Sequence, residues 1–170
     1  NNKSREYNLL DKLDKDDFLL SIANINSDST KLNRLKNCID ILSSDPIFKY
    51  TELFTKLKDS AENYSALKIL YNKLSSGHKI ILDVIVKLVD KVAEKTLLIM
   101  DEPETHLHPP LLSSFIRALS YLLIDRNGVG IIATHSPVIL QEVPKDCVWK
   151  LQRNGSKIKA DRLDIETFGT

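Results

Sequence analysis

Two short apolar runs constrain the fold of this 170-residue chain more than any other feature. Residues 97–100 end at an Asp-Glu pair, and residues 129–133 end at a Thr-His pair. Neither run alternates apolar with polar residues, which is typical of strands in a sheet that is covered on both faces. Residues 109–126 between them predict a helix, because prolines begin this segment and Asn-Gly follows it. A strand, a helix and a strand form a crossover unit, so we expect the two strands to be parallel.

An apolar helix precedes this unit and a hairpin follows it. Residues 79–93 carry apolar side chains around most of a helical surface, so we expect this helix to be nearly enclosed. Near the C-terminus, residues 147–151 and 157–160 flank an Asn-Gly dipeptide, which favours a tight β-hairpin. Residues 74–170 therefore predict an α/β unit with a parallel sheet, flanking helices and a terminal hairpin.

Residues 1–73 have a different texture. They lack glycine, and they are rich in Lys, Asp, Asn and Ser, with apolar residues at helical spacing. Asp45 and Pro46 predict a helix start, whereas residues 24–30 predict a loop. The expected apolar stripes are Leu9, Leu10, Leu13 and Phe18; Leu32, Leu35, Ile39 and Leu42; Phe48, Leu53, Phe54 and Leu57; and Leu67, Leu70, Tyr71 and Leu74. We interpret this half as a helical lobe, whose mixed charges favour a solvated surface over a nucleic-acid-binding arm.

Composition excludes several classes of protein. Hydrophobic residues make up 42% of the chain and charged residues 28%, with a net charge of +1, which excludes wholesale disorder and a polybasic binder. Apolar stretches such as residues 80–86 and 119–124 are too short to span a bilayer, and no secretory signal is present. Cys38 and Cys147 offer no disulfide framework. We therefore expect a cytoplasmic protein without a membrane partner.

Polar residues that follow the two runs are the candidate reaction centre. In parallel α/β sheets, ligands gather at the carboxyl ends of the strands, where these runs deliver Asp101, Glu102 and His135. Each signal alone is weak, because an Asp-Glu pair can cap a helix and a lone histidine is more often structural. Glu104, His106 and His108 suggest an alternative metal site, since alternate side chains of an extended loop share a face.

Four motifs together are far more specific. Residues 74–78 (Leu-Ser-Ser-Gly-His) resemble the signature motif of ABC-type ATPases, and residues 97–103 (Leu-Leu-Ile-Met-Asp-Glu-Pro) resemble their Walker B motif. Residues 104–109 (Glu-Thr-His-Leu-His-Pro) resemble the segment that follows it in the RecF-, SMC- and OLD-like (AAA_21-like) branch. Residues 133–137 (Ala-Thr-His-Ser-Pro) resemble the switch-histidine motif. The order and spacing also match, and the wording is most similar to the PtuA family, the ATPase subunits of Septu anti-phage systems that also occur beside retrons.

The resemblance implies ATP and Mg²⁺ as cofactors. Asp101 would hold Mg²⁺ directly or through water, since this hard cation prefers oxygen ligands. Glu102 would accept a proton from the attacking water or orient it, a role typically worth about 10²–10⁴-fold. His135 would contact the γ-phosphate. The segment containing Glu104 would lie at a dimer seam, which disfavours the metal site suggested above.

The signature motif implies a contact between subunits. Ser75, Ser76, Gly77 and His78 would contact ATP held by the opposite protomer, because the start of a helix attracts anions. ATP would thus join a homodimer or a higher oligomer. Ser76 and His78 depart from the common Leu-Ser-Gly-Gly-Gln form. The serine adds bulk near phosphate, and a histidine titrates near neutrality.

One essential motif is absent. No Gly-x-x-x-x-Gly-Lys-Ser/Thr occurs in the sequence, so the ATPase activity needs a P-loop that this chain does not contain. Either the chain is the C-terminal half of an ABC-type ATPase head or it is a degenerate half-site. The start at Asn1 and the abrupt end favour the first explanation, in which residues 1–73 are the helical insertion before the signature.

We thus expect the ATP-hydrolysing subunit of an anti-phage complex, which dimerises around ATP and regulates a partner nuclease. The resemblance implies an HNH nuclease subunit (PtuB-like) as that partner, with a retron reverse transcriptase and its msDNA, or DNA itself, as further partners. One alternative is a RecF- or SMC-like ATPase of DNA repair or DNA clamping. Another is a nucleotide-binding scaffold with little hydrolysis.

Overall fold

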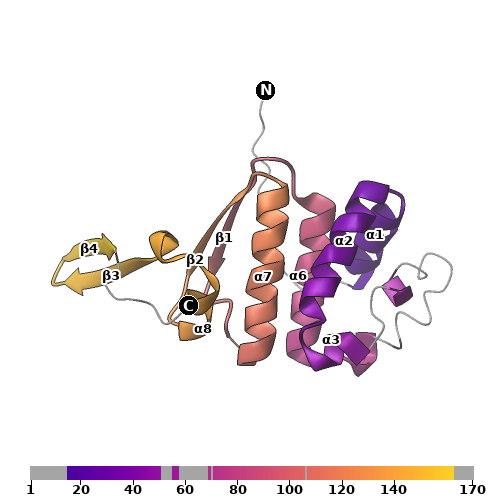
Figure 1. Cartoon of the computed structure of the whole chain (residues 1–170), viewed down its shortest axis with the longest axis horizontal. Helices are drawn as coiled ribbons and strands as arrows, with labels where there is room; N and C mark the ends of the chain where they lie inside the picture. The colour runs from indigo at the N-terminus through magenta and orange to yellow at the C-terminus, as the bar shows by residue number, and fades with distance from the viewer. Residues whose placement is uncertain (1–14, 51–54, 58–68, 70, 106, 163–170) are drawn as a thin grey trace.

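A computed structural model describes residues 15–50, 55–57, 69, 71–105 and 107–162 as a mixed α/β structure (Figure 1). The elements in chain order are α1 (Lys15–Asn26), α2 (Ser29–Leu42), α3 (Pro46–Tyr50), α6 (Ser76–Lys91), β1 (Leu97–Asp101), α7 (Pro109–Asp125), β2 (Val129–Ala133), α8 (Pro137–Glu142), the 3-10 helix η1 (Lys145–Cys147), β3 (Trp149–Asn154) and β4 (Lys157–Arg162). None of the described helices combines the length and the apolar character that crossing a membrane requires.

The crossover unit is confirmed. Strands β1 and β2 are parallel, with Leu97 opposite Val129 and Asp101 opposite Ala133. Helix α7 connects them and lies close against β2, since a Cβ at Gly130 would be only 2.9 Å from a methyl carbon of Leu123. The carboxyl ends of the two strands therefore meet at one edge of the sheet.

The expectation that both faces of this sheet are covered is wrong for the described part of the chain. Leu98 on the α7 side is buried, whereas four apolar side chains on the opposite face are each more than half exposed. They are Leu97, Ile99, Val129 and Ile131. No described element packs on that face, so the apolar runs reflect a surface that the described residues leave uncovered.

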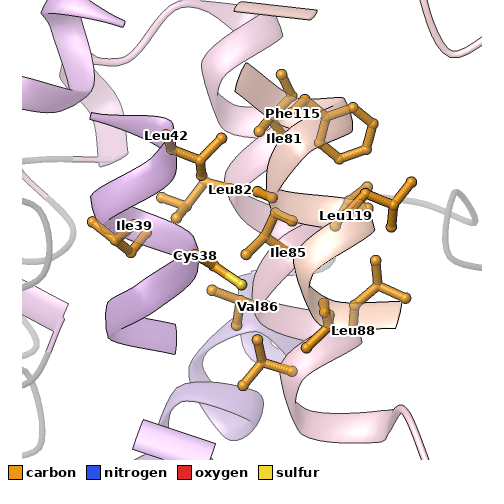
Figure 2. Packing of buried hydrophobic residues seen from close by; sticks show 14 of the residues in the cluster. Cys38, Ile39, Leu42, Ile81, Leu82, Ile85, Val86, Leu88, Phe115 and Leu119 are labelled. Atoms are coloured by element: carbon orange, nitrogen blue, oxygen red, sulfur yellow. The ribbon is translucent and has the colours of Figure 1, made fainter. Parts of the chain in front are cut away.

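Helix α6 is the centre of the hydrophobic core, as its sequence predicts. Residues 81–90 are all buried, and Figure 2 shows side chains of α2 and α7 meeting those of α6. The helix begins at Ser76, three residues earlier than expected, because Ser75 serves as its N-cap. One core thus joins helices from residues 1–73 to helices from residues 74–170.

Local capping explains the helices of the first half. Asp45 accepts a hydrogen bond from the amide of Ile47 at 2.9 Å, which confirms the predicted helix start at Pro46. The predicted loop over residues 24–30 is wrong, because α1 continues to Asn26 and α2 begins at Ser29. Asp28 allows α2 to begin after so short a connection, since its carboxylate caps this helix by accepting hydrogen bonds from two amides.

Several stripe residues of the first half can be compared with the structure. The second stripe is confirmed, with Leu35, Ile39 and Leu42 buried on α2 and Leu32 packed against them. Phe18, Phe48, Leu57 and Leu74 are buried as well. Other stripe residues lie outside the described residues, namely Leu9, Leu10, Leu13, Leu53, Phe54, Leu67 and Leu70.

The terminal hairpin is confirmed and projects from the helical body (Figure 1). Asn154 pairs with Lys157, so the two connecting residues are Gly155 and Ser156 rather than the expected Asn-Gly pair. Gly155 has φ +64°, a conformation that glycine adopts without steric cost.

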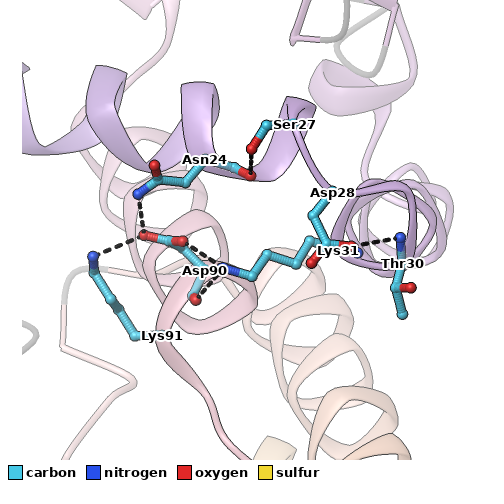
Figure 3. Close-up of polar contacts among 7 residues, drawn as sticks. All are labelled: Asn24, Ser27, Asp28, Thr30, Lys31, Asp90 and Lys91. Atoms are coloured by element: carbon cyan, nitrogen blue, oxygen red, sulfur yellow. Dashed lines mark hydrogen bonds and ion pairs between the residues drawn. The ribbon is translucent and has the colours of Figure 1, made fainter.

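A buried carboxylate at the end of α6 binds donors from two helices of the first half (Figure 3). The Lys31 ammonium lies 2.9 Å from both Oδ1 and the backbone oxygen of Asp90, and Asn24 donates to Oδ2 at 3.4 Å. Lys91 lies 2.9 Å from the same carboxylate. Burial raises the pKa of Asp90, but hydrogen bonds from these three donors outweigh it and leave the pKa below its ordinary value.

Replacing Lys31 with methionine should lower the free energy of unfolding by about 1–3 kcal/mol, because Asp90 would lose a charged donor in a buried position. Lys91→Met is the matched control, since Lys91 contacts the same carboxylate from a more exposed position. We expect the control to cost less than about 1 kcal/mol. Urea unfolding followed by circular dichroism measures both, and equal losses would show that Lys31 has no special role.

Candidate functional site

The acidic pair lies where β1 leaves the sheet. The amide of Glu102 donates to the carbonyl of Ala133 at 2.9 Å, which extends the strand pairing one residue beyond Asp101. Glu102 has φ +44°, a left-handed conformation that is uncommon for any residue except glycine. The chain turns sharply at this point, and the carboxylate of Glu102 is 58% exposed.

The histidine after β2 meets the carboxylates after β1. Nδ1 of His135 lies 3.5 Å from a carboxylate oxygen of Glu102 and 3.3 Å from one of Glu104. The imidazole is largely exposed, and so is Asp101 at the same edge. The structure therefore brings Glu102 and His135 together and places Asp101 at the same edge, as the sequence predicts for residues at the carboxyl ends of the strands.

Glu104 holds the two loops of this edge to each other. Its Oε1 accepts hydrogen bonds from the Thr134 hydroxyl at 2.6 Å and from the His135 amide at 3.0 Å. The same threonine oxygen accepts from the Ser136 amide at 2.9 Å. Burial raises the pKa of Glu104, but these hydrogen bonds and the nearby His135 lower it by more. The pKa of Glu104 is therefore below its ordinary value.

Sequence reasoning considered Glu104 as a metal ligand or as part of a dimer seam and missed this structural role. Of its proposed co-ligands, His106 lies outside the described residues, and His108 is an exposed residue at the start of α7. Among the described residues, no group of three or more histidines, cysteines or acidic residues is arranged to hold a metal ion. One sequence signal could have predicted this contact: the loop after β1 carries a glutamate, an acceptor, and the loop after β2 carries a threonine, a donor.

The exposed carboxylate of Asp101 is a suitable ligand for a magnesium ion that is bound together with a nucleotide. Mg²⁺ usually keeps several waters and is bound through one or two carboxylates together with substrate phosphates, not by a full protein cage. Asp101, beside Glu102, offers such oxygen ligands at an accessible edge. The donor set therefore fits this cation.

The signature turn has an exposed side and a buried side. Ser75 and Ser76 are exposed at the start of α6, whereas Gly77 and His78 are buried. The ring of His78 points inward and contacts Asp45 and the edge of Phe48, with ring centroids 4.9 Å apart for the latter pair. The contact of these four residues with ATP concerns a second subunit, so it stays a prediction.

The signature turn and the acidic pair lie on the same side of the molecule but on different elements. In Figure 1 the start of α6 and the carboxyl ends of β1 and β2 both lie toward the lower edge, with α7 between them. In the described part of the chain, no hydrogen bond or ion pair joins Ser75 or Gly77 to Glu102 or His135. One chain alone therefore does not bring these two groups into contact.

Comparison with known families identifies the family of this chain. The family described as "AAA domain, putative AbiEii toxin, Type IV TA system" (AAA_21) matches residues 1–141. The chain belongs to this AAA domain family. It therefore carries part of a nucleotide-binding ATPase domain, of a family that generally binds ATP and Mg²⁺.

A phage protein shares much of this sequence. Protein ea59 of Escherichia phage lambda is 55% identical over 121 residues, which are 71% of this chain and 21% of that protein. The chain thus spans about a fifth of the length of this curated relative. No solved structure matches the chain.

Replacing Glu104 with alanine should lower the free energy of unfolding by about 1–3 kcal/mol at pH 7, because the Thr134 hydroxyl and the His135 amide would lose their acceptor. The lowered pKa of Glu104 means that its contribution is complete above the pKa of the unfolded state and is lost as pH falls through the folded-state pKa. The difference from wild type should therefore shrink toward pH 3.

Glu102→Ala is the matched control for Glu104→Ala, since it removes an exposed carboxylate from the same loop. We expect its effect on stability to be small at both pH values. Thermal unfolding at pH 7 and pH 3 measures these differences. A loss for Glu104→Ala that is equally large at pH 3 would contradict the assigned role of the carboxylate.

Proposed function

We propose that this chain supplies the acidic pair, the histidine and the signature turn of a composite ATP-hydrolysing site between two subunits. The single observation that carries this proposal is the meeting of Glu102 and His135 at the exposed edge of the sheet, 3.5 Å apart. The separation of Ser75 from that edge supports the division between subunits. Each site would combine the edge of one chain with the signature turn of the other.

The residues at the edge have distinct roles in this proposal. Asp101 holds Mg²⁺, which supplies neutralising charge to the phosphates. Glu102 accepts a proton from the attacking water or orients it, and its exposed carboxylate is accessible for that role. His135 contacts the γ-phosphate, and Glu104 fixes its backbone at the position from which the imidazole reaches outward.

The start of α6 is the element that would reach the partner's nucleotide. Unpaired amides and the positive end of the helix dipole favour a phosphate at this position. Ser75 and Ser76 are exposed there, whereas the ring of His78 faces the core. The two serines and the amides of the first turn therefore make the contact, and His78 supports it from inside.

The P-loop would come from a further segment of a longer polypeptide. Protein ea59 is almost five times as long as the matched region, which supports such an arrangement. The uncovered apolar face of β1 and β2 supports it too, because extended apolar surface is typical of an interface. In this proposal residues 1–73 form the helical insertion, and residues 74–170 complete the ATPase domain.

We infer the biological role from the resemblance of the motif sequences to those of the PtuA family. A PtuA-like ATPase would close around ATP and thereby regulate an HNH nuclease subunit in anti-phage defence. The family description names a toxin of a toxin–antitoxin system, which supports a role in conflict between phage and host. ATP would control the assembly by mass action, since a ligand stabilises the state to which it binds, here the closed dimer.

Glu102→Gln in the full-length protein should retain ATP binding, lose hydrolysis by about 10²-fold or more, and accumulate the closed dimer. The amide keeps the shape of the side chain but cannot accept the proton. Phosphate release and analytical ultracentrifugation measure the two effects. Glu94→Gln is the control, because Glu94 is an exposed glutamate outside this edge. Unchanged turnover in Glu102→Gln would remove this residue from its role.

Ser75→Arg should block ATP-driven closure while each protomer still binds ATP. The long side chain would fill the space that the partner's phosphates need. Ser75 is exposed, so the side chain itself fits, and the lost N-cap of α6 should cost about 0.5–2 kcal/mol of stability. Binding of a fluorescent ATP analogue and sedimentation separate the two properties. Closure that survives this substitution would show that the signature turn does not contact the partner's nucleotide.

A further inference from the structure

A buried imidazole connects the serine of the signature turn to the aspartate that caps α3. His78 is 3% exposed, and both of its ring nitrogens have partners. Nδ1 lies 2.6 Å from the hydroxyl oxygen of Ser75, and Nε2 lies 3.1 Å from Oδ1 of Asp45. The residues form a continuous line from a buried acid, through a buried ring, to an exposed hydroxyl.

The directions of these hydrogen bonds follow from the chemistry of Asp45. Its carboxylate caps α3 by accepting from the amide of Ile47 at 2.9 Å, so it acts as an acceptor toward His78 as well. Nε2 therefore carries a proton. In a neutral imidazole the other nitrogen is then an acceptor, so the Ser75 hydroxyl donates its only proton to Nδ1.

This state leaves Ser75 with no donor for a phosphate. If His78 takes up a second proton, Nδ1 donates to the serine oxygen instead, and the hydroxyl proton is free to point outward to a phosphate oxygen. A buried imidazolium needs a counter-charge, which Asp45 provides. Among the contacts that the structure describes, Asp45 is the charged group at the ring, while Phe48 from α3 and Ser75 from the α6 cap complete its surroundings.

We propose that Asp45 and His78 form a proton relay that converts Ser75 into a phosphate donor when the subunits close around ATP. This inference rests on the proposed contact between Ser75 and the partner's nucleotide. One proton moves from solvent to His78, the existing O–H bond of Ser75 turns from Nδ1 to the phosphate, and no covalent bond other than N–H forms. Asp45 and His78 are positioning residues, because neither touches the nucleotide.

The test measures the ATP concentration that gives half-maximal dimer formation in the full-length protein at pH 6.5 and pH 8. Wild type should close more readily at pH 6.5, because closure takes up a proton. Asp45→Asn should raise the required concentration about tenfold at pH 6.5, because the asparagine oxygen still accepts from Nε2 but carries no charge to balance the imidazolium. ATP binding by the separate protomers should not change.

Asp28→Asn is the matched control for Asp45→Asn. Both aspartates cap a helix, and asparagine is an equally good N-cap, but only Asp45 contacts His78. His78→Gln restores the glutamine of the common signature form and cannot take up a proton, so its closure should depend less on pH than that of wild type, while His135 at the γ-phosphate is unchanged. If the pH dependence is as large as in wild type, or if the two asparagine variants behave alike, the relay is wrong.

A double-mutant cycle separates the relay from the proposed function. Ser75→Ala alone should weaken closure, and adding Asp45→Asn to it should cause no further loss, because the relay acts only through the hydroxyl. Additive losses would overturn the relay and leave the contact of Ser75 with nucleotide intact. No effect of Ser75→Ala would instead overturn that contact, and the relay with it.

Discussion

The enclosure of α6 is the constraint on which the rest of the structure depends. This helix is buried along residues 81–90 and packs against α1, α2 and α7, and α2 also packs against α7 (Figures 1 and 2). A fully buried leucine or isoleucine contributes about 1.5–3 kcal/mol, so these contacts are the main source of stability in the helical body. Because Ser75 precedes the helix and β1 follows it by a short connection, the packing of α6 also sets the positions of the signature turn and the first strand.

The sheet presents a contrast, because one of its faces has no cover among the described residues. Four apolar side chains on that face are more than half exposed, although the strands themselves are paired in the expected register. A two-stranded sheet with one apolar face gains much less from burial than α6 does. The catalytic candidates therefore lie on the sheet, which depends on a further packing partner to bury its apolar face. The helices around α6 bury their apolar side chains without such a partner.

Local signals in the sequence were sufficient for most of the fold. The apolar runs, the prolines at the start of α7 and the aspartate before Pro46 each act within a few residues, so the positions of these strands and helices could be predicted. The uncovered face of the sheet could not be predicted from the runs. The spacing of motifs also predicted that Glu102 and His135 meet, because parallel strands end at the same edge. The loop expected over residues 24–30 failed for a local reason, since Asp28 alone is enough to begin the next helix.

The contacts that sequence reasoning could not supply are those between distant segments. The hydrogen bonds of Glu104 join loops about 30 residues apart, and the contact between Asp45 and His78 spans 33 residues. Nor did the sequence indicate that Glu102 adopts a left-handed backbone, which is set by the turn out of the sheet. Both long-range contacts bury a charged side chain against specific donors, and such pairing is decided by packing rather than by periodicity.

Both ends of α6 are held to the helical segment by charged groups, and this has a mechanical consequence. At the start of the helix His78 contacts Asp45, and at its end Asp90 binds Lys31 of α2 and Asn24 of α1. A buried carboxylate is specific in geometry, because breaking its contacts leaves an uncompensated charge. The helical segment therefore cannot shift along α6 without disturbing one end or the other. Any partner that moves this segment would act on the signature turn and on the approach to β1 together.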